Sequence, residues 1–356
     1  MISIRKYKYI LMALCMLLLA ACKHDDLTVA APNENVRPAG DFVKNNYEMR
    51  LFSAALQKTD YFSKLNAAGP FTVLAPTDAA FNALGIYSAS DFDKMNQDSL
   101  KKVIGYHILP RRLRVDDIPS NGIDVRYTTL EGSDLYVSRA SFNPNGGVEN
   151  ETYFSGAEVT RTDVQVANGT LHLLGSVMKP NFTKNIQQWL AERAEYSVFV
   201  QGLKKFSLWN QLAGQGSFTV FAPSNAALEE IGITSASIEA MDINKYVGER
   251  LFGTYLMHHR HFFVSDAQVF SRINSSSNFE YILNNDSYYM TFSASKAYPT
   301  FKLAYWVSIR AGKGGFDPVI TSGTGDIVAK NDNLCSNGIV HHMVTALLSP
   351  AQAIKQ

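Results

Sequence analysis

Residues 69–85 read Gly-Pro-Phe-Thr-Val-Leu-Ala-Pro-Thr-Asp-Ala-Ala-Phe-Asn-Ala-Leu-Gly, and residues 216–232 read Gly-Ser-Phe-Thr-Val-Phe-Ala-Pro-Ser-Asn-Ala-Ala-Leu-Glu-Glu-Ile-Gly. Each stretch begins with an apolar, β-prone run after a glycine, which predicts a buried strand. A proline then ends the strand, because it has no N–H to donate to a ladder. A short helix follows in both copies, so the same strand-to-helix unit occurs twice.

The residues after each proline predict where the helix begins and ends. Thr77 and Ser224 can accept a backbone N–H as N-caps, and Asp78 places negative charge at the positive end of the first helix. Gly85 and Gly232 can close the two helices, because glycine tolerates the left-handed conformation that is common there.

Two further motifs recur in the same order. Tyr106-His107 lies in a segment that is matched by the segment around Thr254-Tyr255, and the pattern Asn-Gly-x-x-His occurs at 168–172 and 337–341. A repeat of this length is typical of a duplicated domain and is too long for a solenoid. The order of the motifs resembles the fasciclin (FAS1) family over most of the chain. The resemblance implies an α+β fold of two tandem domains, each a small, mostly antiparallel β-wedge or sandwich with packed helices.

Domain boundaries follow from the patterns along the chain. We predict one fasciclin-like domain over 41–182 and a second over 183–356, joined with almost no linker. Residues 41–58 read as one helix with an apolar face. The motifs of the second domain are spaced further apart, which predicts an aromatic-rich insertion at about 267–331.

The composition limits the function classes. The 356 residues are 46% hydrophobic with a net charge of +1, which suffices for two cores and gives no electrostatic preference for nucleic acid. The sequence shows no Gly-x-Ser-x-Gly elbow, phosphate-binding loop, dinucleotide fingerprint or His-Glu-x-x-His motif. We therefore predict no enzyme, no catalytic residue, no metal and no cofactor.

The N-terminal residues predict a lipid anchor. Residues 1–21 have a basic start and a short apolar core, as in a signal peptide. The run Leu-Ala-Ala-Cys ending at Cys22 resembles a bacterial lipobox, which implies acylation of Cys22 and membrane attachment through the lipid. A chance cysteine after an ordinary signal is the alternative. Residues 22–40 would form a flexible stalk. Similarity to lipoproteins of Bacteroidetes type implies the outer membrane and leaves periplasmic or outward orientation open.

Tyr106 and His107 are candidate binding residues. The family resemblance implies a role for this segment in receptor binding. The alternative is structural: near the end of an apolar helix, the tyrosine packs and the histidine satisfies a backbone carbonyl. The second copy has Thr254-Tyr255 instead, which argues against a role shared by both domains.

His172 and His341 follow Asn-Gly turns in equivalent places. We expect a hydrogen bond from either imidazole to the segment of Asp78 or Asn225, which would tie the last strand to the first motif. A hydrolase using His341 or His342 is an alternative, and it requires a carboxylate within hydrogen-bond reach. The five histidines of the second domain match no familiar zinc spacing.

The predicted insertion contains Tyr289, Tyr298 and Trp306. If exposed on one face, these rings could stack on sugars or form the centre of a protein contact. The alternative is that they cover an open sheet edge. Cys335 stands at an apolar strand position, which predicts a buried, inert thiol.

The resemblance implies a surface-anchored, non-enzymatic adhesion or interaction lipoprotein with an extracellular protein or glycan as its partner. A glycan-binding accessory lipoprotein of a polysaccharide-uptake system is the alternative.

Overall fold

A computed structural model describes residues 36–142, 149–181, 183–274, 279–283, 288–297, 302–312, 317–325 and 330–355. The predicted signal peptide, Cys22, most of the predicted stalk and Tyr298 lie outside the described residues. Within the described ranges, no helix combines the length and apolar character needed to cross a membrane.

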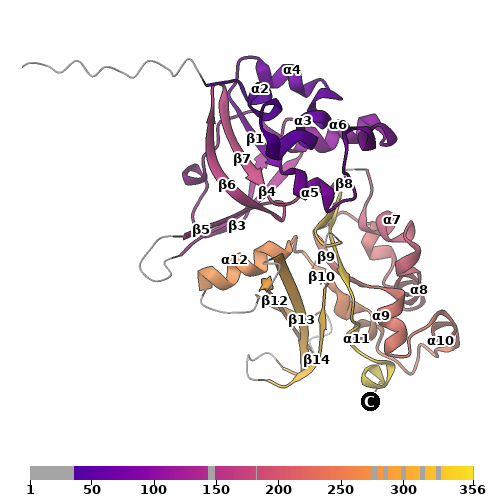
Figure 1. The fold of residues 1–356 in the computed structure, drawn as a ribbon. Coiled ribbons are helices and arrows are strands. Elements are labelled where there is room, and N and C mark those ends of the chain that lie inside the picture. The colour runs from indigo at the N-terminus through magenta and orange to yellow at the C-terminus, as the bar shows by residue number, and fades with distance from the viewer. Residues whose placement is uncertain are drawn as a thin grey trace, which may run out of the picture. The chain divides into compact units, whose positions relative to one another are not determined.

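The first half begins with short helices and then forms one sheet. Its helices are α2 (Ala39–Lys44), η1 (Tyr47–Met49), α3 (Arg50–Gln57), α4 (Tyr61–Asn66), α5 (Asp78–Asn82), η2 (Ala89–Lys94), α6 (Gln97–Tyr106) and η3 (Val115–Asp117). Its strands are β1 (Phe71–Pro76), β2 (Ile108–Leu109), β3 (Gly122–Thr128), β4 (Asp134–Phe142), β5 (Glu149–Phe154), β6 (Ala157–Val166) and β7 (Gly169–Leu174). Figure 1 shows helices α2 to α6 gathered beside β1 and β7.

The sheet of the first half is mostly antiparallel, as the resemblance implies. The strand order is β2-β1-β7-β6-β5-β4-β3, and β1 and β7 are its parallel pair. The single helix expected over 41–58 is wrong, because α2 ends at Lys44 and Asn46 caps a new 3-10 turn by accepting the N–H of Glu48. An asparagine at that place favours a cap over a continuous helix.

The second half repeats this order of elements. Its helices are α7 (Ile186–Ala191), η5 (Ala194–Tyr196), α8 (Ser197–Lys205), η6 (Asn210–Ala213), α9 (Asn225–Glu230), α10 (Ser235–Ala240), α11 (Gly248–Leu251), η7 (Gly253–Tyr255), α12 (Val264–Asn274) and η8 (Pro350–Ala353). Its strands, with β8 from the connection, are β8 (Pro180–Asn181), β9 (Phe218–Pro223), β10 (Leu256–His258), β11 (Phe279–Ile282), β12 (Tyr289–Ala297), β13 (Lys302–Arg310), β14 (Val319–Thr324), β15 (Asn333–Cys335) and β16 (Gly338–Met343).

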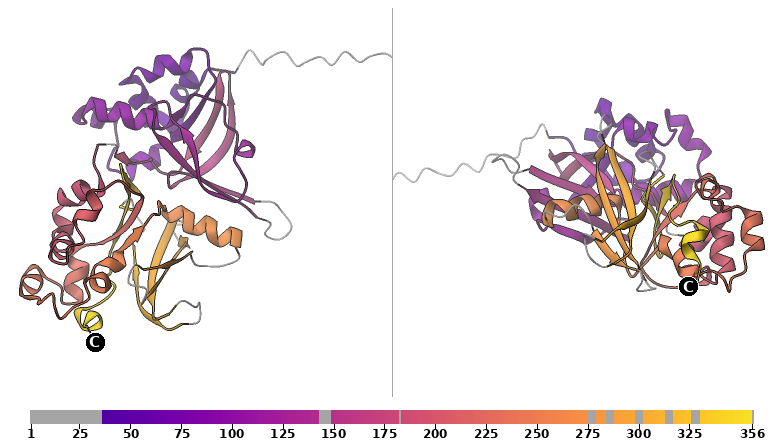
Figure 2. Two further views of the ribbon diagram at one scale, coloured as in Figure 1. Left: turned by 180° about the vertical axis from the view of Figure 1, so that it is seen from behind. Right: turned by 90° about the horizontal axis from the view of Figure 1, so that it is seen from below.

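The strands of the second half form two sheets. One has the order β10-β9-β16-β15-β8 and the other β11-β12-β13-β14. In the view from behind, the pink and salmon helices α7 to α10 gather on the side of the strands away from the orange β12–β13 hairpin (Figure 2).

The central strand pair has the same register in both halves. Phe71 pairs with Gly169 at the start of β1 and β7, and Phe218 pairs with Gly338 at the start of β9 and β16. A side chain on either glycine would collide with the backbone of its phenylalanine partner, which explains the Asn-Gly turns. The duplicated sequence therefore folds into a duplicated structure.

Most of the predicted insertion has a counterpart in the first half. The four-stranded β11–β14 sheet corresponds to the β3–β6 part of the first sheet, with β6 divided into β14 and β15. Among the described elements, α12 is the addition, since the first half has only the three-residue η3 at that place. The expected insertion over 267–331 was therefore too broad.

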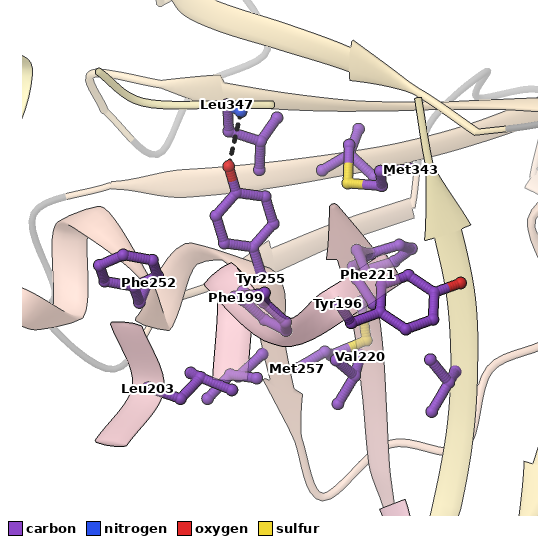
Figure 3. Packing of buried hydrophobic residues seen from close by; sticks show 14 of the residues in the cluster. Tyr196, Phe199, Leu203, Val220, Phe221, Phe252, Tyr255, Met257, Met343 and Leu347 are labelled. Carbon is purple, nitrogen blue, oxygen red and sulfur yellow. Dashed lines mark hydrogen bonds between the residues drawn. The ribbon is translucent and has the colours of Figure 1, made fainter. Parts of the chain in front are cut away.

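Each half has its own hydrophobic core. One cluster of buried side chains draws on residues between 39 and 177, and another draws on residues between 186 and 353. Figure 3 shows part of the second cluster, where Tyr255 stands among Phe199, Phe252 and Met257 and its hydroxyl accepts the N–H of Leu347 at 2.7 Å. A third cluster joins the halves through Phe263, Leu334 and Ile339.

Candidate functional site

The motif residues after each strand fix the neighbouring helices. Thr77 accepts the N–H of Ala80 at 3.3 Å, and Ser224 accepts that of Ala227 at 3.2 Å, so both expected N-caps are present. Asp78 also accepts the N–H of Leu51 at 2.8 Å. In the second half, Asn225 accepts the N–H of Val198 at 3.0 Å. Asp78 and Asn225 therefore join the first motif of each half to the N-terminal end of α3 or α8.

His172 and His341 make one matching set of contacts, and the bond expected to Asp78 or Asn225 is wrong. The Nδ1 of His172 accepts the N–H of Asp163 at 3.2 Å, and its Nε2 donates to the carbonyl of Leu113 at 2.9 Å. His341 makes the same two bonds with Asp332 and Phe262, at 3.2 and 2.9 Å. Strand alternation turns each ring toward the loop after β2 or β10 and away from the motif helix.

The surroundings of His341 do not support a hydrolase. Its pKa is lowered by burial, and the rings of Phe221, Phe292 and Tyr305 lie around it. The nearest carboxylate oxygen, on Asp332, is 3.6 Å from Nδ1 and already accepts the N–H of Val264. His342 is also buried, and its Nδ1 bonds to the hydroxyl of Tyr196 at 2.8 Å. Neither ring leaves room for a substrate beside it, so the structure contradicts the hydrolase alternative.

Tyr106 and His107 lie in the core, which contradicts their candidacy as binding residues and agrees with the structural alternative. The Tyr106 hydroxyl bonds to the carbonyl of Asp134 and the hydroxyl of Ser155 at 2.9 and 2.8 Å. The Nδ1 of His107 donates to the carbonyl of Val103 at 2.8 Å, and burial lowers the His107 pKa to about 4. Both side chains are fully buried, so a partner could reach neither without opening the core.

Of Tyr289 and Trp306, the two members of the predicted aromatic set that the structure describes, Trp306 is the exposed one. The residue lies in β13 and its side chain is 37% exposed. β13 is paired on both sides, by β12 and β14, so Trp306 does not cover a sheet edge and that alternative is wrong for it. Tyr289 in β12 is half-buried, and its hydroxyl donates to Glu280 at 2.9 Å.

The face of the β11–β14 sheet that carries Trp306 points away from the core. Alternation along β13 buries Tyr305, Val307 and Ile309 on one side and leaves Trp306 and Ser308 on the other. We call the second side the outer face. It presents an aromatic ring on a strand that is paired on both sides, a geometry suited to binding.

A second candidate region lies where the halves meet. α12 packs against β4 of the first half and β12 of the second. The Asp266 carboxylate accepts the hydroxyl of Ser138 from the other half and the N–H of Phe263 at 2.8 Å. Asp266 is fully buried, and burial raises its pKa to about 7. Glu151 accepts bonds from Gln268 and Arg272 of α12 at 3.2 and 3.3 Å.

Beside this junction is a cavity of about 180 Å³. Its wall includes Gly156, Lys179 and Asp332 with apolar groups from Tyr153 and Leu303. The Lys179 ammonium donates to the carbonyl of Asn331, and burial lowers the Lys179 pKa to about 8. Within the described residues, no group of three side chains could hold a metal ion.

The Fasciclin domain family matches residues 48–180 and 194–350, one match to each half of the duplicated fold. The chain belongs to this family.

The Fasciclin domains of this chain are similar to parts of several known proteins. Human periostin is 26% identical over 194 residues, which are 53% of this chain and 21% of periostin. Protein sll1483 of Synechocystis is 30% identical over 131 residues, 36% of this chain and 64% of that protein. Immunogenic protein MPB70 of Mycobacterium bovis is 30% identical over 148 residues, 40% of this chain and 69% of that protein.

A solved pair of FAS1 domains from the insect cell adhesion molecule Fasciclin I is also similar. It shares 18% identity, and the match covers 85% of this chain and 97% of that one with a TM-score of 0.39.

Lys179 and Asp266 are the site residues that the Fasciclin motifs did not indicate. Each makes a contact with the other half of the chain, Lys179 with Asn331 and Asp266 with Ser138. Neither residue belongs to a repeated motif, so the sequence carried no signal for them. They are recognised only from the packing of one domain on the other.

Proposed function

We propose that this chain is a non-enzymatic adhesion or interaction protein, anchored to the outer membrane by a lipid on Cys22. Several acyl chains would hold it durably, because each buried methylene contributes roughly 0.8 kcal/mol. The stalk over 22–40 would give reach. The two Fasciclin domains would then meet an extracellular protein or glycan.

The exposed outer face with Trp306 carries this proposal. An indole that is more than one-third exposed on a central strand adds little to the core, whereas tryptophan is enriched at the centres of binding surfaces. Membership in the Fasciclin domain family supports the proposal, and the absence of a substrate-accessible base at His341 is consistent with it. Many tethered copies would bind together, so weak single contacts would suffice.

Bead attachment tests the proposal. Beads carrying many copies of the chain from Leu27 onward are passed over an array of extracellular proteins and glycans. We expect attachment to at least one spot, about tenfold fewer beads with Trp306→Ala, and no change with Tyr87→Ala, whose ring is 72% exposed in the first half. No attachment at any spot, or full attachment of Trp306→Ala beads, would contradict the proposal.

The lipid anchor is tested separately in cells. Cys22→Ala removes the thiol that would be acylated, so we expect the protein to leave the membrane fraction. If the variant stays in that fraction, the anchor is wrong even where the adhesive face is right.

The exposure of Trp306 also favours a second candidate function, a glycan-binding accessory lipoprotein of a polysaccharide-uptake system. An exposed ring is what stacking on a sugar requires. The two candidates share the outer face and differ in the chemistry of the partner.

A further inference from the structure

The outer face surrounds one large aromatic ring with small side chains. Ser293 of β12 and Thr324 of β14 stand directly opposite Trp306 on the neighbouring strands. Ala304 and Ser308 lie two residues away along β13, on the same side of the sheet. Because these neighbours are small, no tall side chain stands directly across from the indole or next to it along the strand.

The next row of the sheet repeats this chemistry. Ser308 and Ser322 pair across β13 and β14 and add their hydroxyl groups, whereas Thr291, their partner on β12, is only 4% exposed. A hydroxyl can both donate and accept a hydrogen bond, as the hydroxyls of a sugar can. The two rows therefore combine a stacking surface with groups that match a polyol.

The charged groups described on this face already have partners. Glu280 accepts the hydroxyl of Tyr289 at 2.9 Å, and Arg310 donates to the carbonyl of Asp317 at 2.7 Å. Lys296 lies on the opposite side of β12 and pairs with Glu158 of the first half at 2.6 Å. Glu280 and Arg310 keep their charges, because their partners are neutral, but the two charges have opposite signs. The described groups therefore give a charged ligand no net attraction, which favours a neutral one.

The same residues argue against a protein as the occupant. The core of a protein interface is rich in apolar and aromatic residues and poor in serine. Here three of the four neighbours of Trp306, namely Ser293, Ser308 and Thr324, carry hydroxyl groups. The exposed apolar residues described on this face, Ile282 and Val319, lie further along the edge strands. They are separated from the indole by the row that contains Ser308.

We propose that the outer face binds a neutral polysaccharide, with one sugar ring stacked on Trp306 and its hydroxyls bonded to the adjacent serine and threonine side chains. The C–H groups on one side of a pyranose ring are weakly positive and meet the negative face of the indole. This inference rests on the proposed function and names the class of its partner.

Affinity gel electrophoresis of the chain from Leu27 onward tests the inference. The gels contain laminarin, soluble starch, galactomannan or hydroxyethylcellulose as neutral chains, and alginate or heparin as anionic ones. We expect at least one neutral polysaccharide to retard the protein. Trp306→Ala should weaken that retardation at least tenfold, and Trp306→Phe should keep part of it because a ring remains.

Tyr87→Ala is the matched control, an exposed ring removed from the other half, and should migrate as the unchanged protein does. Thermal unfolding of each variant shows whether it is folded. If Trp306→Ala does not fold, Ser322→Lys replaces it, because a lysine in the hydroxyl row should block the sugar without touching the core.

Three results would overturn the inference: no retardation in any neutral gel, retardation only by alginate or heparin, or equal retardation of a folded Trp306→Ala variant. If beads attach to a protein spot through Trp306 while no neutral gel retards the protein, the adhesive function is supported and the neutral polysaccharide is ruled out as the partner. If a neutral gel retards the protein but beads attach at no spot, binding of the polysaccharide is supported and the adhesive function is contradicted.

Discussion

His172 and His341 connect the last strand of each half, β7 or β16, to the loop that follows β2 or β10. Each ring bonds to one backbone N–H and one carbonyl, and each is fully buried, which lowers its pKa. The sequence indicated a structural role from the Asn-Gly-x-x-His spacing. It could not indicate the partner carbonyls of Leu113 and Phe262, because these lie in loops whose path depends on the whole sheet.

At this scale we predict that His172→Ala lowers the free energy of unfolding by about 3 kcal/mol, because two buried backbone groups lose their partner and a cavity remains. Urea unfolding measures the loss. His259→Asn is the control, since His259 is exposed and should change stability by less than about 0.5 kcal/mol. Equal stability of the two variants would show that the His172 bonds contribute nothing.

The β5–β6 hairpin and α12 form the junction between the halves. Gly156 turns the hairpin at φ +84°, and a Cβ there would lie 2.8 Å from the carboxylate of Asp332. Gly132 turns the β3–β4 hairpin at φ +100° with nothing within 4 Å of such a Cβ. The two glycines share the backbone constraint and differ in the contact with the other half.

We therefore predict that Gly132→Ala costs about 1 kcal/mol of stability, from the positive φ alone. Gly156→Ala should cost roughly 1–2 kcal/mol more, because Asp332 must move and release the N–H of Val264 at the start of α12. Thermal unfolding compares the two variants. If Gly132→Ala and Gly156→Ala lose the same stability, the β5–β6 hairpin does not pack closely against Asp332 of the second half.

Asp266 of α12 makes the junction sensitive to pH. Its pKa is raised to about 7, chiefly by burial, against about 3.9 in the unfolded chain. The folded state therefore binds the extra proton, so this contribution to stability is complete below about pH 4 and is lost as the pH rises through 7.

Asp266→Asn should stabilise the protein at pH 8 by about 2 kcal/mol and change little at pH 4, because the amide can still bond to Ser138 and Phe263. Unfolding at both pH values is the measurement. If Asp266→Asn were less stable than the unchanged protein at pH 8, the ionised Asp266 carboxylate would stabilise the folded state, which would contradict this prediction.

For the whole molecule, the duplication, the α+β class and the mostly antiparallel sheets could be predicted from the sequence. The recurring strand-proline-helix unit specifies them locally. Two features could not be predicted: the packing of α12 between the halves, and the choice between the binding and the structural role of Tyr106 and His107. Both depend on contacts between segments far apart in the chain, such as Tyr106 with Ser155 and Asp266 with Ser138.

The central claim is that the outer face of the β11–β14 sheet is the surface that meets the partner. Blocking it covalently is the most direct test. Cys335 is buried, and burial raises its pKa to about 12, so in the chain from Leu27 onward it should not react and an added cysteine alone takes a maleimide-polymer label. We predict that a labelled Ser322→Cys variant loses bead attachment, whereas a labelled Tyr87→Cys variant keeps it. Full attachment of the labelled Ser322→Cys variant would contradict the account.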